Sequence, residues 1–218
     1  MSDPAAFVRA ETVIAAPPLV PEIRLHLASE VVPLWQATEE TLTRQGLPPP
    51  YWAFAWPGGQ AIARHLLDHP SLARGKRVLD FAAGCGLAAI AAAKSGAALV
   101  QAAEIDAFAL AAIALNAAEN RVIVETVERD LVGGPSAWDL MLAGDVCYER
   151  PMAERVARWL AALAAGGTEV LMADPGRAYL PQQGLVEVAR YTVPTSLELE
   201  DRKERETILW RWVGPTKF

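Results

Sequence analysis

The sequence has few cysteines, few histidines and no long apolar run free of charge. Two cysteines and three histidines occur among 218 residues, which are too few for a disulfide framework and lack the spacing of metal ligands. No apolar stretch reaches the roughly 18 residues of a membrane-spanning helix. The opening residues contain neither the basic and apolar regions of a signal peptide nor an Arg-rich transit segment. These absences predict a protein of a reducing cytoplasm, with no metal site and no membrane partner.

Positive charge is also scarce. The chain has 20 basic and 26 acidic residues, which gives a net charge of −6. No segment concentrates lysine and arginine as binding to a phosphate backbone requires. We therefore expect no nucleic-acid partner.

The apolar content is high enough for one full core, at 52% of the residues. Residues 15–21 contain three prolines and cannot sustain a helix, so they separate a short N-terminal arm from the rest of the chain. The pattern of residues 34–45 predicts a helix. We expect an N-terminal arm and helix at residues 1–48 to pack on a single domain at residues 49–218.

Strands and helices alternate through most of the chain. The predicted strands span residues 76–81, 98–103, 121–128, 138–143 and 168–173, and the predicted helices span residues 58–69, 87–95, 108–120 and 152–165. This order implies a doubly wound α/β fold with a mainly parallel sheet, because parallel neighbours need crossover connections. The β-rich stretches 185–193 and 207–213 have no convincing helix between them. They predict a C-terminal antiparallel hairpin that brings the sheet to seven strands.

A glycine loop comes after the first of these strands, in the segment Val78-Leu79-Asp80-Phe81-Ala82-Ala83-Gly84-Cys85-Gly86-Leu87. Gly84 and Gly86 permit positive φ and a close approach of ligand atoms to backbone N–H groups at a helix N-terminus. The loop fits the dinucleotide pattern G-x-G-x-x-A, and Glu104 lies where a ribose-binding carboxylate belongs. Taken alone, the loop predicts a nicotinamide or flavin enzyme as readily as any other nucleoside-binding enzyme.

Asp80 distinguishes the two ligand classes. A carboxylate four residues before the glycine would repel a pyrophosphate, whereas the amino acid end of S-adenosylmethionine is cationic and carries no phosphate. The loop therefore favours S-adenosylmethionine. Glu104 can accept from both ribose hydroxyls, and Asp130, after the third strand, is placed to accept from the adenine amino group.

An acidic residue comes after each of the first four strands of this sheet, and Asp145 is the one after the fourth. The carboxyl ends of parallel strands meet at one edge, where open α/β sheets bind their ligands. We expect these acids to surround one site. Asp106 is interpreted instead as the N-cap of the second helix of this region.

These segments resemble class I, seven-strand methyltransferases, whose first motif is D/E-x-G-x-G-x-G. Asp80, Ala82, Gly84 and Gly86 stand at its positions, and Ala82 departs from the first glycine. A tight turn without strongly positive φ would tolerate that alanine.

Three further segments resemble the protein-lysine branch of this family, and closely the lysine methyltransferases that act on the electron transfer flavoprotein β subunit. They are Pro50-Tyr51-Trp52-Ala53-Phe54-Ala55-Trp56-Pro57-Gly58-Gly59-Gln60, Gly144-Asp145-Val146-Cys147-Tyr148 and Asp174-Pro175-Gly176-Arg177. The second contains the D-x-x-Y motif of the branch. The resemblance covers roughly residues 50 to 180, and the arm and the tail match only loosely.

The resemblance implies an S-adenosylmethionine-dependent lysine N-methyltransferase. Methyl transfer needs an uncharged amine about 3 Å from the methyl carbon in a dry site. Asp145 is the predicted acceptor that holds the lysine nitrogen, and Tyr148 the predicted wall beside the lysine stem. Trp56 would cover the cofactor and Trp52 the mouth of the site.

The favoured substrate is an electron transfer flavoprotein β subunit, with a ribosomal protein as a second possibility. Three alternatives stay open: a small-molecule methyltransferase, a regulatory module without turnover, and a nicotinamide-dependent oxidoreductase. Asp174 and Arg177 either shape the substrate mouth or form an internal ion pair. His65 and His69 are interpreted as surface residues, and Cys85 and Cys147 as small buried side chains.

Overall fold

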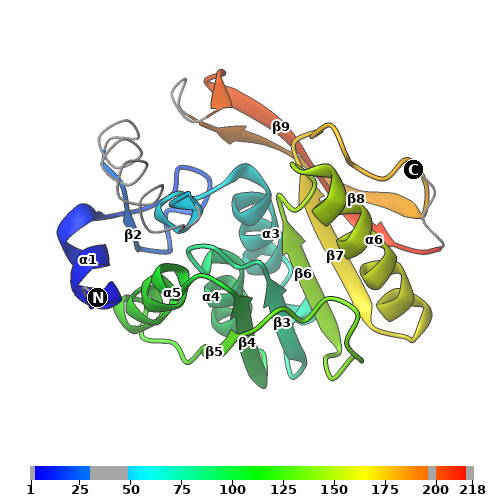
Figure 1. The fold of residues 1–218 in the computed structure, drawn as a ribbon, viewed down its shortest axis with the longest axis horizontal. Coiled ribbons are helices and arrows are strands. Elements are labelled where there is room, and N and C mark those ends of the chain that lie inside the picture. The colour runs from blue at the N-terminus through cyan, green and yellow to red at the C-terminus, as the bar shows by residue number, and fades with distance from the viewer. Residues whose placement is uncertain (1–2, 30–48, 196–199, 215–218) are drawn as a thin grey trace.

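The computed structural model describes residues 3–29, 49–195 and 200–214, and a twisted sheet with helices on both faces forms its body (Figure 1). The parallel strands are β3 (Arg77–Phe81), β4 (Leu99–Glu104), β5 (Glu125–Glu128), β6 (Leu140–Gly144) and β7 (Glu169–Asp174). The antiparallel hairpin consists of β8 (Leu185–Pro194) and β9 (Glu204–Trp212). The strand order is β5-β4-β3-β6-β7-β9-β8. The predicted fold class, a mainly parallel seven-stranded sheet with a C-terminal hairpin, is confirmed.

The strand order reverses between β3 and β6, because the chain first adds β4 and β5 on one side of β3 and then places β6 on the other. Such a reversal leaves a crevice outside the carboxyl ends of the two strands. Any ligand of this sheet is expected at that point.

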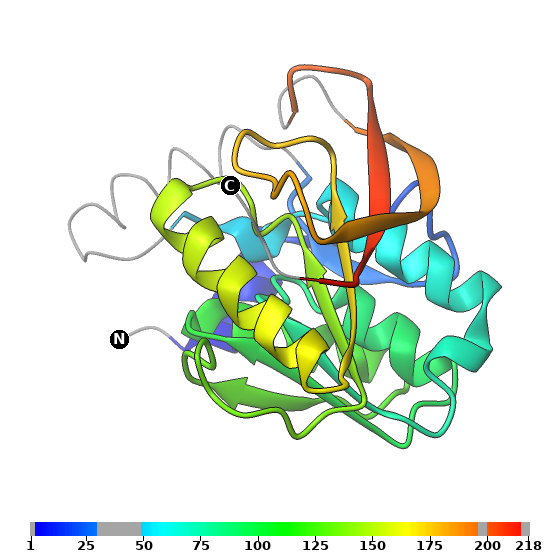
Figure 2. The ribbon, with the colours of Figure 1, turned by 90° about the vertical axis from the view of Figure 1, so that its right-hand side faces the viewer.

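Helices cover both faces of the sheet, as Figure 2 shows for α3 and α6. They are α3 (Pro57–Asp68), α4 (Leu87–Lys94), α5 (Ala107–Glu119) and α6 (Arg150–Ala165). Side chains of α3, α4 and α5 join one buried cluster with Val78 and Leu142, and those of α6 join a second with Leu79 and Met141. Neighbouring residues of one strand point to opposite faces, so β3 and β6 are buried on both.

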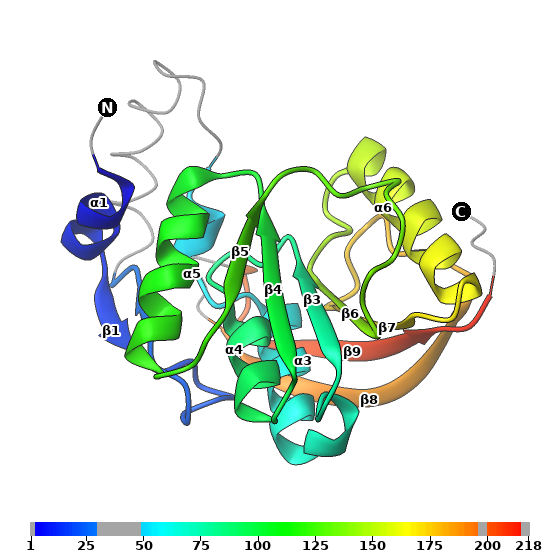
Figure 3. The ribbon, with the colours of Figure 1, turned by 90° about the horizontal axis from the view of Figure 1, so that it is seen from below.

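The N-terminal arm contains three elements that were not predicted from the sequence: α1 (Pro4–Glu11), β1 (Val13–Ala15) and β2 (Leu25–Leu27). Asp3 caps α1 by accepting from the N–H of Ala5 at 3.1 Å. Figure 3 shows α1 beside α5, where Phe7 lies 5.1 Å from Phe108 between ring centroids. The helix predicted at residues 34–45 lies outside the described residues.

One predicted strand was too long at its start. Residues 121–124 do not join the sheet, and β5 begins at Glu125. Arg121 has a φ of 56°, a left-handed conformation that a strand cannot contain. Within the described ranges, no helix combines the length and the apolar character needed to cross a membrane.

Candidate active site

A cavity of about 500 Å³ opens at the reversal point of the sheet. Its volume is within the usual range for small-molecule sites, roughly 300 to 1,000 Å³. Seven of the nine predicted site residues line it: Trp56, Ala82, Gly84, Glu104, Asp130, Asp145 and Tyr148. The structure therefore brings together residues from the glycine loop, the ends of β4 and β6, and the aromatic segment before α3. Asp80 and Gly86 do not line the cavity.

Asp80 lies behind the glycine loop, with 3% of its surface exposed. Its Oδ2 accepts from the backbone N–H of Ala89 in the first turn of α4, at 2.9 Å. Burial raises the pKa of Asp80 to about 8. The prediction that Asp80 meets the cationic end of the ligand is therefore not what the geometry shows. Asp80 anchors the start of α4, and thereby the loop that lines the cavity.

The loop itself is left-handed at Ala82, Gly84 and Gly86, with φ values of 52°, 53° and 76°. The expectation that Ala82 lies in a turn without strongly positive φ is wrong. An alanine is strained in this conformation, which the buried surroundings of the loop must maintain. At Gly86 a Cβ would lie 3.1 Å from Ile113 of α5. Gly86 therefore lets α4 and α5 approach each other, and it does not line the cavity.

Glu104 joins the end of β4 to the glycine loop. Its Oε1 accepts from the N–H of Gly84 at 2.8 Å and its Oε2 from the N–H of Ile105 at 3.1 Å. Each carboxylate oxygen has a second lone pair, so both can still accept from a hydroxyl. Burial raises the pKa of Glu104. Two adjacent acceptors of this kind suit the two hydroxyls of a ribose.

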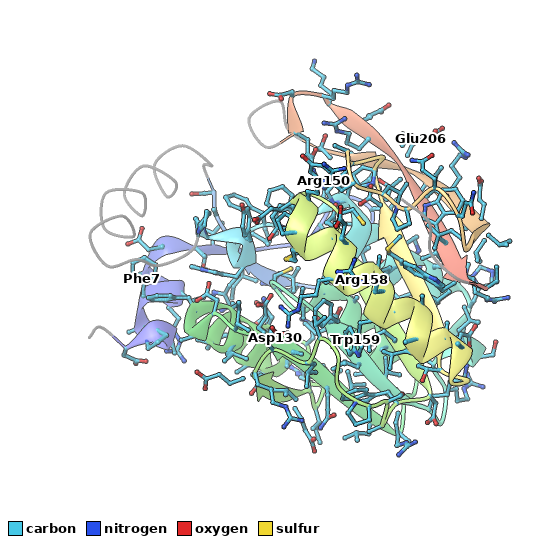
Figure 4. All side chains as sticks on the ribbon, turned by 45° about the vertical axis from the view of Figure 1, so that its right-hand side comes forward. Phe7, Asp130, Arg150, Arg158, Trp159 and Glu206 are labelled. Atoms are coloured by element: carbon cyan, nitrogen blue, oxygen red, sulfur yellow. The ribbon has the colours of Figure 1, made fainter. Side chains whose placement is uncertain are left out.

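Two neighbouring acids have further local partners. Asp106 caps α5 by accepting from the N–H of Phe108 at 2.8 Å, as predicted. Asp130, labelled in Figure 4, accepts from the N–H of Val132 at 3.0 Å and forms an ion pair with Arg155 of α6. These two bonds lower the pKa of Asp130, so it is an anionic acceptor at the cavity wall.

Asp145 comes directly after β6 in a left-handed conformation with a φ of 57°. Its Oδ2 accepts from the N–H of Gly58 at 2.6 Å and of Gly59 at 3.3 Å, both in the first turn of α3. Its Oδ1 accepts from Nη2 of Arg177 at 3.0 Å. Burial raises the pKa of Asp145 to about 7, although Arg177 opposes the shift. One lone pair of Oδ1 is left for a further donor.

Glycine is required where α3 meets the end of β6. A Cβ on Gly58 would lie 2.5 Å from both Oδ2 of Asp145 and the carbonyl oxygen of Ala173, and one on Gly144 would lie 2.9 Å from the N–H nitrogen of Gly59. Gly58 and Gly59 were not predicted as site residues from the sequence. A signal was present, because Pro57 and the two glycines after it favour a helix N-terminus with room for a close neighbour.

An aromatic wall closes one side of the cavity. Tyr51 lies 5.8 Å from Trp56 and 5.5 Å from Tyr148 between ring centroids, and the indole N–H of Trp56 donates to the carbonyl oxygen of Tyr51 at 2.8 Å. Tyr148 is 43% exposed, and burial of its hydroxyl raises the pKa to about 12. The phenol therefore stays neutral at physiological pH. Trp52 also lines the cavity, although it is only 2% exposed and stacked on Phe108.

The segment after β7 supplies Arg177, the arginine of the cavity that contacts Asp145. Oδ1 of Asp174 accepts from the N–H groups of Gly176 at 2.8 Å and of Arg177 at 2.6 Å, which fixes the turn. The guanidinium of Arg177 then pairs with Asp145 and with Glu200, and its Cζ lies 5.7 Å from the centroid of the Trp56 ring. Arg177 therefore lines the cavity and also forms an internal ion pair, the two roles predicted for this segment. Its partners in the ion pair are Asp145 and Glu200, and not Asp174. Glu200, which precedes β9, was not predicted from the sequence.

His65 is not a surface residue, contrary to the sequence-based interpretation. It is 6% exposed, and its Nδ1 lies 2.8 Å from the hydroxyl of Tyr191 on β8. Burial lowers the pKa of His65. The hairpin covers this face of α3, which the helical pattern alone could not show. Cys85 and Cys147 are buried thiols, as predicted.

The donors and acceptors of the cavity fit a nucleoside that carries a cationic amino acid better than a dinucleotide. A pyrophosphate at the glycine loop would need the free N–H groups of the α4 N-terminus. The buried carboxylate of Asp80 already takes the N–H of Ala89. The remaining wall presents carboxylates for hydroxyl and amine donors, together with aromatic rings, and two of its three arginines, Arg155 and Arg177, are already paired with Asp130 and Asp145. S-adenosylmethionine has this chemistry.

Comparisons with known proteins agree with this geometry. A family model described as ribosomal protein L11 methyltransferase (PrmA) matches residues 64–144. The chain is 38% identical over 216 residues to the electron transfer flavoprotein beta subunit lysine methyltransferase of Xenopus laevis, with 95% of this chain and 86% of that protein covered. It is 37% identical over 201 residues to the protein of the same name from Danio rerio, with 89% and 77% covered.

Solved structures show the same fold. Magnesium protoporphyrin IX methyltransferase from Synechocystis PCC 6803, crystallised with bound S-adenosylmethionine, superposes with a TM-score of 0.53 over 97% of this chain and 98% of that chain. The sequence identity is 14%. This similarity concerns the fold and not the acceptor of the methyl group.

Proposed function

Since this chain belongs to the family of electron transfer flavoprotein β subunit lysine methyltransferases, we propose that its own substrate is a lysine side chain of an electron transfer flavoprotein β subunit. The enzyme is an S-adenosylmethionine-dependent protein-lysine N-methyltransferase. We also propose a role for each site residue and a cytoplasmic compartment. Two unpaired, buried cysteines are compatible with the reducing environment of that compartment.

One observation supports the reaction most directly: a carboxylate fixed at the cavity by two different elements. Asp145 is held by the first turn of α3 through Gly58 and by Arg177 from the segment after β7. When bound, S-adenosylmethionine supplies an electrophilic methyl group on a sulfonium centre. Oδ1 of Asp145 then accepts a hydrogen bond from an N–H of the lysine amine. This bond orients the lone pair of the amine nitrogen and stabilises the charge that develops on that nitrogen.

The other residues bind or enclose the two substrates. Glu104 accepts from the ribose and Asp130 from the adenine amino group, while Ala82 and Gly84 form the loop against which the cofactor packs. Trp56 and Tyr51 exclude water, and Tyr148 borders the lysine stem with its ring. Asp80 and Gly86 act indirectly, because they hold the loop and α4 in place.

A ribosomal protein is the second candidate substrate, suggested by the name of the matching ribosomal protein L11 methyltransferase model. That match covers residues 64–144, which include the glycine loop and Glu104. It ends before Asp145 and Tyr148, on the acceptor side of the cavity. The match therefore supports the cofactor half of the site and says little about the acceptor.

The test is methylation of a recombinant bacterial electron transfer flavoprotein β subunit with labelled S-adenosylmethionine, and then mass spectrometry of its lysines. We expect wild type to label the protein. Asp145→Asn should lower kcat by on the order of 10² to 10³, the loss typical of one transition-state hydrogen-bond partner. Calorimetric binding of S-adenosylhomocysteine should be nearly unchanged in this variant.

Two outcomes would contradict the proposed substrate. Label that appears only in small molecules of a cell extract would support the small-molecule alternative, and label in a ribosomal protein would support the second candidate. An Asp145→Asn variant with wild-type kcat would remove Asp145 from the reaction.

A further inference from the structure

Arg177 contacts two carboxylates with one nitrogen. Its Nη2 lies 3.0 Å from Oδ1 of Asp145 and 2.7 Å from Oε1 of Glu200. A guanidinium Nη carries two N–H groups, so each carboxylate receives one. Arg177 therefore does not form the two-nitrogen fork on Asp145 that would neutralise a carboxylate most completely. Among the described residues, its Nε has no hydrogen-bond partner.

Glu200 is fixed from a second side. Its side chain is 2% exposed, and its Oε2 accepts from Nε of Arg205 at 3.0 Å. Nη2 of Arg205 also donates to the backbone carbonyl oxygen of Glu200 at 2.9 Å. A buried carboxylate is very costly unless it is paired, and both oxygens of Glu200 are paired with arginines. Glu200 precedes β9 and Arg205 lies on it, so the C-terminal hairpin region contacts Arg177 from outside the cavity.

The charges of this cluster do not balance. The cluster contains the three carboxyl groups of Asp145, Asp174 and Glu200 and the two guanidinium groups of Arg177 and Arg205. When all are ionised, one negative charge is left over. A lysine ammonium that enters the site would bring the net charge of the cluster to zero. Without Glu200 the cluster would already be neutral, so a cationic side chain would gain less electrostatic free energy on entering the site.

We infer that Glu200 is a positioning residue for the reaction: it holds Arg177 away from full pairing with Asp145, so that Oδ1 of Asp145 stays a strong hydrogen-bond acceptor for the lysine nitrogen. This inference rests on the proposed role of Asp145 as the acceptor of that nitrogen. Glu200 itself does not line the cavity. It acts through Arg177, which does.

The first test needs no substrate. In the full chain labelled with ¹³C-aspartate, the carboxyl signal of Asp145 is assigned by its loss in Asp145→Asn and then titrated. We expect Glu200→Gln to lower the midpoint of Asp145 by roughly one pH unit, because Arg177 then pairs with Asp145 alone. Asp174 from the end of β7 also acts on Asp145, and Asp145 in turn acts on Cys147 of its own loop. Both stay unchanged in the variant.

Two further variants test the direction of the shift in the Asp145 midpoint and provide a control for it. Arg205→Met frees Glu200 to attract Arg177 more strongly, so the midpoint of Asp145 should rise. Glu206→Gln removes the same charge from an exposed position on β9, labelled in Figure 4, where Glu206 pairs with Arg190. It should leave the midpoint unchanged. If Glu200→Gln does not fold, the upward shift in Arg205→Met still decides the question.

The second test is the pH profile of kcat/KM with the flavoprotein subunit. Glu200→Gln should lower kcat/KM about tenfold and move the acid limb to lower pH, whereas a merely structural loss would lower the profile without moving it. A midpoint and an acid limb equal to those of wild type would overturn the inference. If wild type does not methylate this substrate, the substrate proposal fails, and the aspartate titration still judges the role of Glu200.

Discussion

Two residues at the cavity that are not glycine, Ala82 and Asp145, have left-handed backbone conformations. Such residues cost of order 1 kcal/mol or more each and persist when the surrounding structure fixes them. At Asp145 the strain accompanies a functional side chain. At Ala82 no side-chain function offsets it.

Replacement of Ala82 should therefore stabilise the protein. We expect Ala82→Gly to raise the free energy of unfolding by about 1 kcal/mol, which corresponds to an increase in Tm of about 2 to 4 °C. The matched control is Ala83→Gly, whose φ is not positive and which should lower stability by roughly 0.5 to 1 kcal/mol. Calorimetry of the three proteins checks the prediction, and a lower Tm in Ala82→Gly would contradict it.

The buried carboxyl of Asp80 should make stability depend on pH. Its pKa is about 8 in the folded protein and about 3.9 in an unfolded chain. Between these values the folded state binds more protons than the unfolded state, so stability falls as pH rises through this window. Asp80→Asn cannot titrate, and we expect its stability to fall less between pH 5 and pH 8.

Urea unfolding at several pH values measures this slope. Asp139→Asn is the control, because the pKa of this exposed carboxyl is lowered by Arg77 and it titrates below the window. Its slope should match that of wild type. Equal slopes in Asp80→Asn and wild type would show that Asp80 does not titrate as a buried acid.

Site residues could be predicted from the sequence where the signal was local. Glu104 ends one strand and Asp145 comes directly after another, and parallel strands end at one edge, so their meeting could be predicted. The bonds of Asp145 could not, because Gly58 is 87 positions away and Arg177 is 32 positions away. The backbone conformation of Ala82 was also missed, since alanine gives no sign of positive φ.

Among elements, the contact between α3 and the end of β6 is the most sensitive to a change in volume. Gly58→Ala would place a methyl group 2.5 Å from Oδ2 of Asp145 and the carbonyl oxygen of Ala173. The first turn of α3 must then move. We expect kcat to fall on the order of a hundredfold, the effect of a misplacement of about 1 Å at a reacting group.

The adjacent glycine provides the matched comparison. A Cβ on Gly59 would meet nothing within 4 Å, and alanine is the better helix former by up to about 1 kcal/mol. Gly59→Ala should keep wild-type kcat and a slightly higher Tm. Similar kcat values in the two variants would mean that the position of α3 does not govern the activity.

Most helices and strands from residue 57 onward were predictable because they are rich in apolar residues and because several carry glycine or proline at an end, as α3 and α6 do. The N-terminal elements were not. α1 has a single buried residue, Val8, and β1 and β2 have three residues each. Elements this short depend on contacts with the rest of the molecule, here the aromatic group of Phe7, Trp52 and Phe108.

For the whole molecule, ligand binding should be measurable as global stability. A ligand at 100 times its Kd adds about 2.7 kcal/mol, which raises the Tm of a protein of this size by roughly 5 to 10 °C. We expect this shift with S-adenosylhomocysteine and none with NAD at the same concentration. A shift with NAD alone would contradict the assignment of the cavity to S-adenosylmethionine.

The sheet order was predictable for the parallel part, because crossover connections have one hand. The placement of β9 between β7 and β8 was not, since either hairpin strand could have joined β7. That placement brings Glu200 and Arg205 to Arg177. No local pattern in the sequence indicates this cluster, because its members come from three separate segments.

The position of β9 has a consequence during protein synthesis. In the described structure β8 pairs only with β9, so the hairpin cannot join the sheet until residues beyond 204 have left the ribosome. The strands and loop that bind the methyl donor are made earlier. Arg177 therefore acquires its second carboxylate partner, Glu200, only late in translation, after the residues that line the cavity have been made.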